Sequence, residues 1–150
     1  MTAIAIILFT VSASAWVGAI LFQSAVVAPA VFRHLDESQA RLLLRGLFPR
    51  FFRFGLICGA LMLAAAVSLG SATEWSGTLA ALTAATFIMI VLETISLLMV
   101  PPINAARDAG EAGSVRFRRL HGTSVALTLI ILLLGIGILA TVAARAAAGA

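Results

Sequence analysis

Four long apolar stretches take up most of this 150-residue chain, and they limit what it can fold into. They cover residues 3–32, 51–71, 79–100 and 120–144. At about 1.5 Å of rise per residue, a helix of roughly 20 residues matches a hydrocarbon core about 30 Å thick. Because the chain is 62% apolar and only 11% charged, a soluble domain of this size could not cover four such segments with polar surface. The sequence therefore predicts a polytopic membrane protein.

The apolar stretches are continuous rather than alternating. Residues 4–9 and 129–134 contain no polar side chain, whereas the strands of a membrane β-barrel alternate in polarity. A helix is the other way to satisfy backbone polar groups in lipid. We therefore expect an all-α fold, a four-helix bundle that forms a single transmembrane domain over residues 1–150.

The arginines are distributed unevenly between the connections. Nine of the ten lie in 33–53 or 101–119, while the second connection, 70–78, carries only Glu74, and Arg145 stands alone after the fourth stretch. By the positive-inside rule the two arginine-rich connections face the cytoplasm, so both termini lie outside. This predicts a multi-pass inner-membrane (plasma-membrane) protein. The lipid bilayer and a second copy of the chain are the expected partners, and nucleic acid is not, since topology already accounts for the basic residues.

The prolines and one capping motif predict where the helices begin and end. Asp36 followed by Gln39 resembles a capping box, and the leucines and arginines that follow indicate a short amphipathic helix in the membrane interface. Pro49 is expected to end that helix. Pro101 and Pro102 are expected to stop the third spanning helix, and Pro29 to kink or end the first.

Small residues occur at helix-packing spacing. Gly55 and Gly59 form a GxxxG pattern in the second stretch, and Ser14 and Gly18 a similar pair in the first. Each pair permits close approach of another helix, either within the bundle or in a dimer.

Glu93 is the most informative polar residue, because it lies about two turns inside the third apolar stretch. An ionisable group at this depth is costly, so it should face the bundle interior and have a partner. Thr83, Thr86 and Ser96 fall on the same side of the helix. Two interpretations remain open: a proton or cation site, and a structural hydrogen-bonding post between helices.

Further polar residues are expected at a similar depth. His121, Ser124 and Thr128 share one face of the fourth helix, and Gln23 precedes Arg33 by ten residues in the first. We therefore expect Gln23, Glu93, His121 and Ser124 to converge as a binding site in the cytoplasmic half of the bundle. The residues expected to form its cytoplasmic mouth are Asn104, Arg107 and Asp108.

The chain carries no HExxH, CxxC, P-loop, GxGxxG or GxSxG motif. This favours a protein that is not an enzyme, with no catalytic residue and no cofactor predicted. His121 and His34 are the candidate ligands if haem or copper is bound after all.

A series of short runs suggests a family. The opening Trp16-Val17-Gly18 is followed by VVAPAVF (26–32), LFPRF (47–51), PINAARD (102–108) and FRRLHGTS (117–124). In this order they resemble a bacterial family of four-helix membrane proteins that is similar to human transmembrane protein 205. The resemblance extends over nearly the whole chain and implies the four-helix topology and the handling of a metal or small molecule.

The same opening is also similar to two other membrane families, the copper-resistance D family and the haem-dependent protoporphyrinogen oxidases. Those proteins use a histidine early in their first helix, and residues 9–11 here contain none. Three functions follow as hypotheses. The first is transport or handling of a metal, cation or small solute, the second a haem- or copper-dependent oxidoreductase, and the third a non-catalytic subunit of a membrane complex.

Overall fold

The computed structural model describes residues 2–148, and its elements in that range are all helical. Four helices, Thr2–His34, Glu37–Ala72, Gly77–Asp108 and Gly110–Ala148, are long and apolar enough to cross a membrane, which confirms the predicted all-α four-span fold. The elements in order are α1 (Thr2–Phe22), the π-helical η1 (Gln23–Val27), α2 (Ala28–His34), α3 (Glu37–Ala72), α4 (Gly77–Asp108), the 3-10 helix η2 (Gly110–Gly113) and α5 (Ser114–Ala148).

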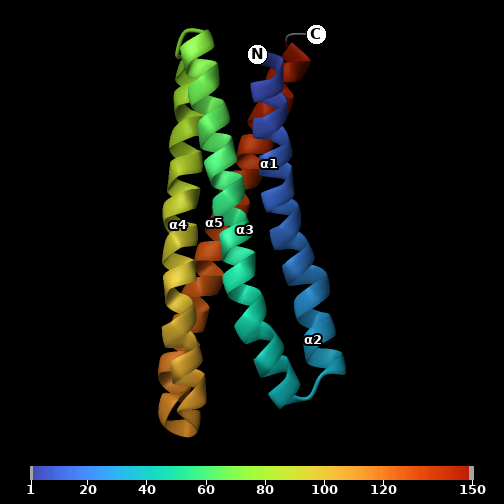
Figure 1. Cartoon of the computed structure of the whole chain (residues 1–150), viewed down its shortest axis with the longest axis vertical. Coiled ribbons are helices and arrows are strands. Elements are labelled where there is room, and N and C mark those ends of the chain that lie inside the picture. Colours follow the sequence, from blue (N-terminus) through green and yellow to red (C-terminus); the bar gives the residue numbers. More distant parts are fainter. Residues whose placement is uncertain (1, 149–150) are drawn as a thin grey trace.

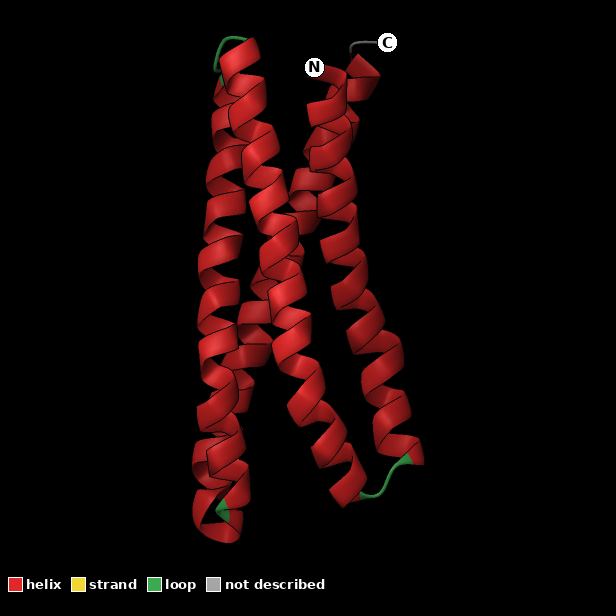
Figure 2. Ribbon diagram, viewed as in Figure 1, coloured by secondary structure: helices red, strands yellow, loops and turns green. Residues whose placement is uncertain are grey.

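The helices run up and down, and the two ends of the chain lie at the same end of the bundle (Figure 1). Short connections join the helices at both ends (Figure 2). Each long helix contacts two neighbours, in the cyclic order α1, α3, α4, α5. In Figure 1, α5 starts beside α4 and ends beside α1, so that α2 and the first turns of α5 are far apart at the end opposite the termini. We call this the arginine-rich end, because α2, α4 and η2 finish there and α3 and α5 begin there, with nine of the ten arginines.

The centre of the bundle is filled by large apolar side chains from all four helices. Trp16, Met62, Met89 and Ile131 are at most 1% exposed and belong to one cluster. Large apolar side chains also cover the outer faces, as is expected of helices that meet lipid rather than water. Those at least half exposed include Ile4, Ile57, Phe87, Leu98 and Leu133.

The GxxxG pattern of α3 is used inside the bundle. A Cβ atom placed on Gly59 would lie 2.6 Å from Cγ1 of Ile90 in α4 and 3.0 Å from Cζ3 of Trp16 in α1. Gly55 is equally crowded by neighbours in the same two helices. The two glycines therefore let α1 and α4 approach α3 closely. Gly18, by contrast, has open space where a Cβ would lie.

The expected interfacial helix and the expected stop in the third helix were both wrong. Residues 37–48 are helical, but they continue through Pro49 as part of α3. Likewise α4 passes through Pro101 and Pro102 and ends at Asp108. Proline removes a backbone hydrogen bond and crowds the preceding turn, yet membrane helices tolerate it where neighbouring helices and local adjustments compensate.

Pro29 does not end the first spanning helix, which continues from Thr2 to His34. The π-helical segment Gln23–Val27 precedes Pro29, and the backbone N–H of Ala28 donates to the carbonyl of Gln23, five residues back. Such a wide turn accommodates the hydrogen bond that Pro29 cannot make, without ending the helix. The irregularity lies at Gln23, one of the predicted site residues.

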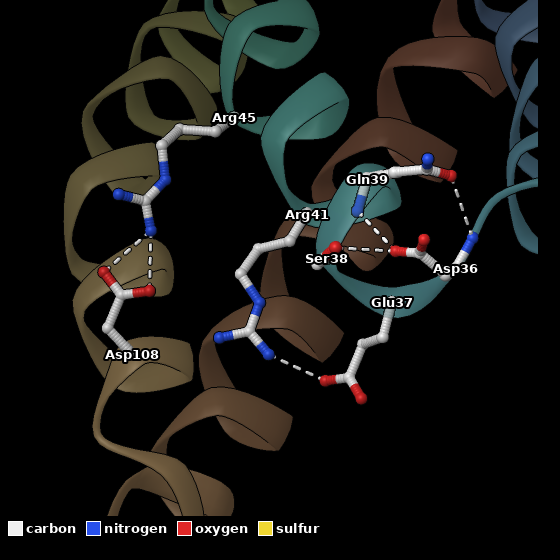
Figure 3. A network of polar contacts seen from close by, with 7 residues as sticks. All are labelled: Asp36, Glu37, Ser38, Gln39, Arg41, Arg45 and Asp108. Atoms are coloured by element: carbon white, nitrogen blue, oxygen red, sulfur yellow. Dashed lines mark hydrogen bonds and ion pairs between the residues drawn. The ribbon is translucent and has the colours of Figure 1, made fainter.

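The capping box at the start of α3 is confirmed (Figure 3). Oδ1 of Asp36 accepts from the backbone N–H of Gln39 over 2.9 Å, and Oε1 of Gln39 accepts from the backbone N–H of Asp36 over 3.4 Å. The hydrogen bond from Gln39, together with the Ser38 hydroxyl, holds the pKa of Asp36 below its usual value. The start of α3 is therefore fixed beside the end of α2.

Candidate functional site

A cavity of about 500 Å³ lies between the helices in the arginine-rich half. We call it the arginine-end cavity. Its volume is within the range of small-molecule sites. Every long helix contributes residues to its walls. The helices α2 and α5 diverge towards this end of the bundle. The lining residues are Ile20, Gln23, Ser24, Ala28 and Phe32 from α1–α2; Leu44, Phe48, Phe51 and Phe52 from α3; Val100, Ile103, Asn104 and Arg107 from α4; and His121, Ser124, Val125, Thr128, Leu129 and Leu132 from α5.

The wall contributed by α3 is aromatic. Phe48 and Phe52 are stacked one turn apart, with ring centroids separated by 6.0 Å, and the ring of Phe51 meets that of Phe52 edge-on at 5.4 Å. Phe52 is buried and the other two rings are half-buried. These rings make a rigid apolar surface that an aliphatic or aromatic group can contact.

Polar side chains reach the same cavity from the other helices. Gln23 is 8% exposed, and its amide nitrogen has no hydrogen-bond partner among the described residues. Ser124 is buried in α5. One turn before it, the ring of His121 stacks on Phe117 with centroids 5.4 Å apart and planes 5° apart. Asn104 is half-buried near the end of α4. A buried amide donor without an acceptor is costly, so Gln23 is suited to binding a molecule in the cavity.

Arg107 connects this cavity to a second pocket at the rim of the bundle. The rim pocket, of about 590 Å³, is formed by residues from α2, α3, α4, η2 and α5 and shares Phe32, Leu44 and Arg107 with the arginine-end cavity. The guanidinium of Arg107 lies over the ring of Phe117, with its Cζ atom 4.5 Å from the centroid. This cation–π contact holds the side chain between the two spaces.

The acidic residues near Arg107 are engaged by other arginines (Figure 3). Nη2 of Arg45 donates to both carboxylate oxygens of Asp108, at 2.6 and 2.7 Å, and thereby joins α3 to the end of α4. Within α3, Arg41 pairs with Glu37 at 2.7 Å. The positive charge of Arg107 is therefore not neutralised by an ion pair within residues 2–148.

Glu93 lies in the interior of the bundle, deeper than the cavity. It is 1% exposed, and it is not among the residues that line the cavity. Its Oε1 atom and Nε1 of Trp16 both crowd the position that a Cβ of Gly55 would take, the latter at 2.6 Å. The absence of a side chain on Gly55 thus allows a carboxyl group from α4 and an indole from α1 to meet beside α3. In the described residues neither atom makes a regular hydrogen bond.

The buried hydroxyl groups of Thr86 and Ser96, on the Glu93 side of α4, do not supply the missing hydrogen-bond partner. The hydroxyls of Thr86 and Ser96 each donate to the backbone carbonyl four residues earlier, over 2.8 and 3.0 Å. Both residues are fully buried on the same side of α4 as Glu93. Their donors are satisfied within their own helix, so Trp16 is the donor best placed to serve Glu93.

The two histidines occupy different positions. His121 lines the arginine-end cavity, whereas His34 is exposed at the end of α2 and is not part of its lining. Residues 2–148 contain no group of three or more histidine, cysteine, aspartate or glutamate side chains arranged to hold a metal ion.

Gln23, His121, Ser124, Asn104 and Arg107 thus line one cavity, while Asp108 faces only the rim pocket. Sequence reasoning did not anticipate the contact of Trp16 with Glu93 or the wall of phenylalanines. The signals for both were present in the sequence. Trp16 lies too deep for the interfacial belt, so its N–H group needs a hydrogen-bond acceptor inside the bundle. The phenylalanines of the wall are clustered where the second apolar stretch begins.

The apolar helices and the arrangement of charges define the chain as a polytopic α-helical membrane protein. It belongs to the family described as Domain of unknown function (DUF4149), whose model matches residues 11–112, from within α1 to η2. No curated protein and no solved structure matches the chain.

Proposed function

We propose that this protein takes up a small solute in the arginine-end cavity and moves it into, out of or across the membrane. The observation that carries this proposal is a cavity of about 500 Å³ that is lined by all four spanning helices and that has both an aromatic wall and polar groups. Binding sites commonly combine a mostly apolar lining with a few polar groups that orient the ligand. The unpartnered amide nitrogen of Gln23 is one such group.

Two further features support the cavity as the working part of the molecule. The π-helical segment of the first span begins at Gln23, and such segments occur frequently at functional sites. In addition, the cavity lies where α2 and α5 diverge, away from the tightly packed centre at Trp16 and Ile131. A rocking movement of α2 against α5 would change access to the cavity.

The membrane and the orientation are part of the proposal. The nine arginines at one end favour placing that end in the cytoplasm and the protein in the inner membrane. The resemblance to the bacterial family similar to transmembrane protein 205 agrees with small-molecule handling. Four spans enclose little volume, so complete transport would require a second copy of the chain.

Glu93 has a supporting role in this proposal. It belongs to the packed layer that closes the deep end of the cavity, through its contacts with Gly55 and Trp16. We assign it to holding α1, α3 and α4 together at that level. Solute binding belongs to Gln23, Ser124, His121, Asn104 and Arg107.

The proposal is tested by measuring which small molecules stay bound to the protein after extraction from its native membrane in mild detergent. Ser124→Phe places a ring in the cavity, and the matched control Ala126→Phe places one on an exposed position of the same helix that does not line it. Native mass spectrometry should find one or more small molecules on the wild type and on Ala126→Phe, and none on Ser124→Phe. The same bound species on all three proteins would contradict a solute site in this cavity.

A further inference from the structure

We propose that the occupant of the arginine-end cavity is a single-chain amphipathic anion, bound with its head group at Arg107 and its apolar chain against the phenylalanine wall of α3. This inference rests on the proposed function, since it requires that the cavity holds a solute, and it adds the chemical class of that solute. It also excludes the metal or cation that the sequence left open as cargo of this cavity.

The charges around the cavity favour an anion. Arg107 is the charged residue in the lining, and the acids nearest to it, Asp108 and Glu37, are already paired with Arg45 and Arg41. The cavity therefore presents an arginine whose charge no protein carboxylate neutralises in residues 2–148. A sulfonate, phosphate or carboxylate group can accept two parallel hydrogen bonds from a guanidinium, whereas a cation placed there would be repelled.

The hydrogen-bonding groups agree with the charges. The amide nitrogen of Gln23 is a buried donor that lacks an acceptor within the described chain. The hydroxyl of Thr128 already donates to the carbonyl of Ser124 over 3.0 Å. A head group with acceptor oxygens can satisfy Arg107, but an ammonium head group, which offers only donors, cannot.

The rest of the lining favours an apolar chain. Phe48, Phe51 and Phe52 form one side of the cavity, and aliphatic side chains of α4 and α5 form much of the remainder. A volume of about 500 Å³ is suited to one small ligand. We therefore assign the occupant as a molecule with a single apolar chain rather than as a two-chain membrane phospholipid.

The cavity reaches the lipid-facing surface. Among its lining residues, Phe32 of α2 is 67% exposed, and Val125 and Leu129 of α5 are each 54% exposed. These three residues lie on the two helices that diverge at the arginine-rich end. An amphiphile dissolved in the bilayer could thus enter sideways with its chain in the apolar region, while its head group stays at the level of Arg107.

The test uses three probes that share one brominated chain and differ in head group: ω-bromoundecanesulfonate, ω-bromoundecyltrimethylammonium and ω-bromoundecanol. Bromine quenches tryptophan fluorescence at short range, and Trp16 is the natural reporter, because it lies one turn from the cavity residue Ile20. The other tryptophan, Trp75, is exposed beside Gly70 at the opposite end and is removed by Trp75→Phe. The protein is reconstituted in phosphatidylcholine vesicles, which carry no net charge of their own.

The sulfonate should quench Trp16 at much lower membrane concentration than the ammonium probe. Arg107→Gln should weaken sulfonate quenching roughly 10- to 150-fold, the range expected for losing a hydrogen bond to a charged group. Arg107→Lys should keep the preference for the sulfonate. The matched control Arg116→Gln removes an exposed arginine of the same end that does not line the cavity, and it should change nothing.

Three results would overturn the inference: equal or stronger quenching by the ammonium probe, no difference between Arg107→Gln and Arg116→Gln, or relief of sulfonate quenching by phosphatidylglycerol added to the vesicles. The last result would identify a two-chain anionic lipid as the occupant. If the alcohol probe still quenches and Ser124→Phe abolishes that quenching, the cavity site survives and only the anion assignment fails. If Ser124→Phe leaves quenching by all three probes unchanged, the proposed function fails as well.

Discussion

The close meeting of three helices at Gly55 allows a sharp prediction about stability. A Cβ atom added there would overlap Oε1 of Glu93 and lie 2.6 Å from Nε1 of Trp16 and 2.8 Å from Cδ of Glu93. All of these atoms belong to side chains that are 1% exposed, so they have little room to move. Gly55→Ala must therefore shift a helix or force a side chain from its preferred rotamer, which typically costs about 1–3 kcal/mol.

The control is Gly18→Ala in α1, because a Cβ at Gly18 meets no atom within 4 Å. Both substitutions replace glycine by alanine inside a helix, so the gain in helix propensity, about 1 kcal/mol, is common to both and cancels. The difference in free energy of unfolding between the two variants is then the overpacking cost itself. It corresponds to a change of roughly 5- to 150-fold in the unfolding equilibrium.

The assay is titration of each purified variant from mild detergent into dodecyl sulfate, followed by far-ultraviolet circular dichroism. We expect Gly18→Ala to match or exceed the wild type and Gly55→Ala to unfold at clearly lower dodecyl sulfate. If Gly55→Ala is as stable as Gly18→Ala, then Trp16 and Glu93 do not meet at Gly55, and the packing described for the deep end of the cavity is wrong.

Three further predictions concern other polar groups. Glu93→Gln should leave the free energy of unfolding within about 1 kcal/mol of the wild type or raise it, because the amide keeps the shape of the carboxyl group and cannot ionise at a depth where a charge is costly; Glu93→Ala should be less stable than Glu93→Gln in the same titration. Since the pKa of Asp36 is lowered in the folded protein, its cap should stabilise the start of α3 above the ordinary aspartate pKa and lose this effect as the pH falls through the lowered value. The protection factors for hydrogen exchange at residues 37–41, which compare each rate with the intrinsic rate at the same pH, should therefore fall in acid in the wild type, and Asp36→Asn should show no such step. Finally, the Arg45–Asp108 pair is about half exposed, so a double-mutant cycle with Arg45→Gln and Asp108→Asn should give a coupling energy below about 1 kcal/mol; a larger value would mean that the pair is a principal tie between α3 and α4.

Much of the fold could be predicted from the sequence, because the strongest signals in it are local. Hydropathy fixes four spans, and the capping box of Asp36 and Gln39 fixes the start of α3. The prolines were misleading, since Pro49, Pro101 and Pro102 lie inside long helices. A proline disrupts only its own turn, and the packed neighbours of a membrane helix can outweigh that cost.

The candidate site was predictable in its depth but not in its contacts. Gln23, Ser124 and His121 could be assigned to one half of the bundle by counting residues from the arginines. Which of them meet depends on how each helix is rotated, and hydropathy gives little information on rotation when a helix is apolar on every side. For this reason Glu93 was expected at the same site as Gln23, whereas it lies against Trp16 and Gly55 instead.

The most direct test of the central claim, a solute-accessible cavity with a positive end, is the chemical reactivity of a thiol placed inside it. Ser124→Cys in a Cys58→Ser background, which removes the only native thiol, would be exposed to anionic sulfonatoethyl and cationic trimethylammonioethyl methanethiosulfonate, with Ala126→Cys as the matched lipid-facing control. With each reagent's rate normalised to that with a free thiol in solution, Ser124→Cys should react with both reagents and faster with the anionic one, and Ala126→Cys with neither. A Ser124→Cys thiol as inert as that of Ala126→Cys would contradict the cavity, and a faster reaction with the cationic reagent would contradict its positive end.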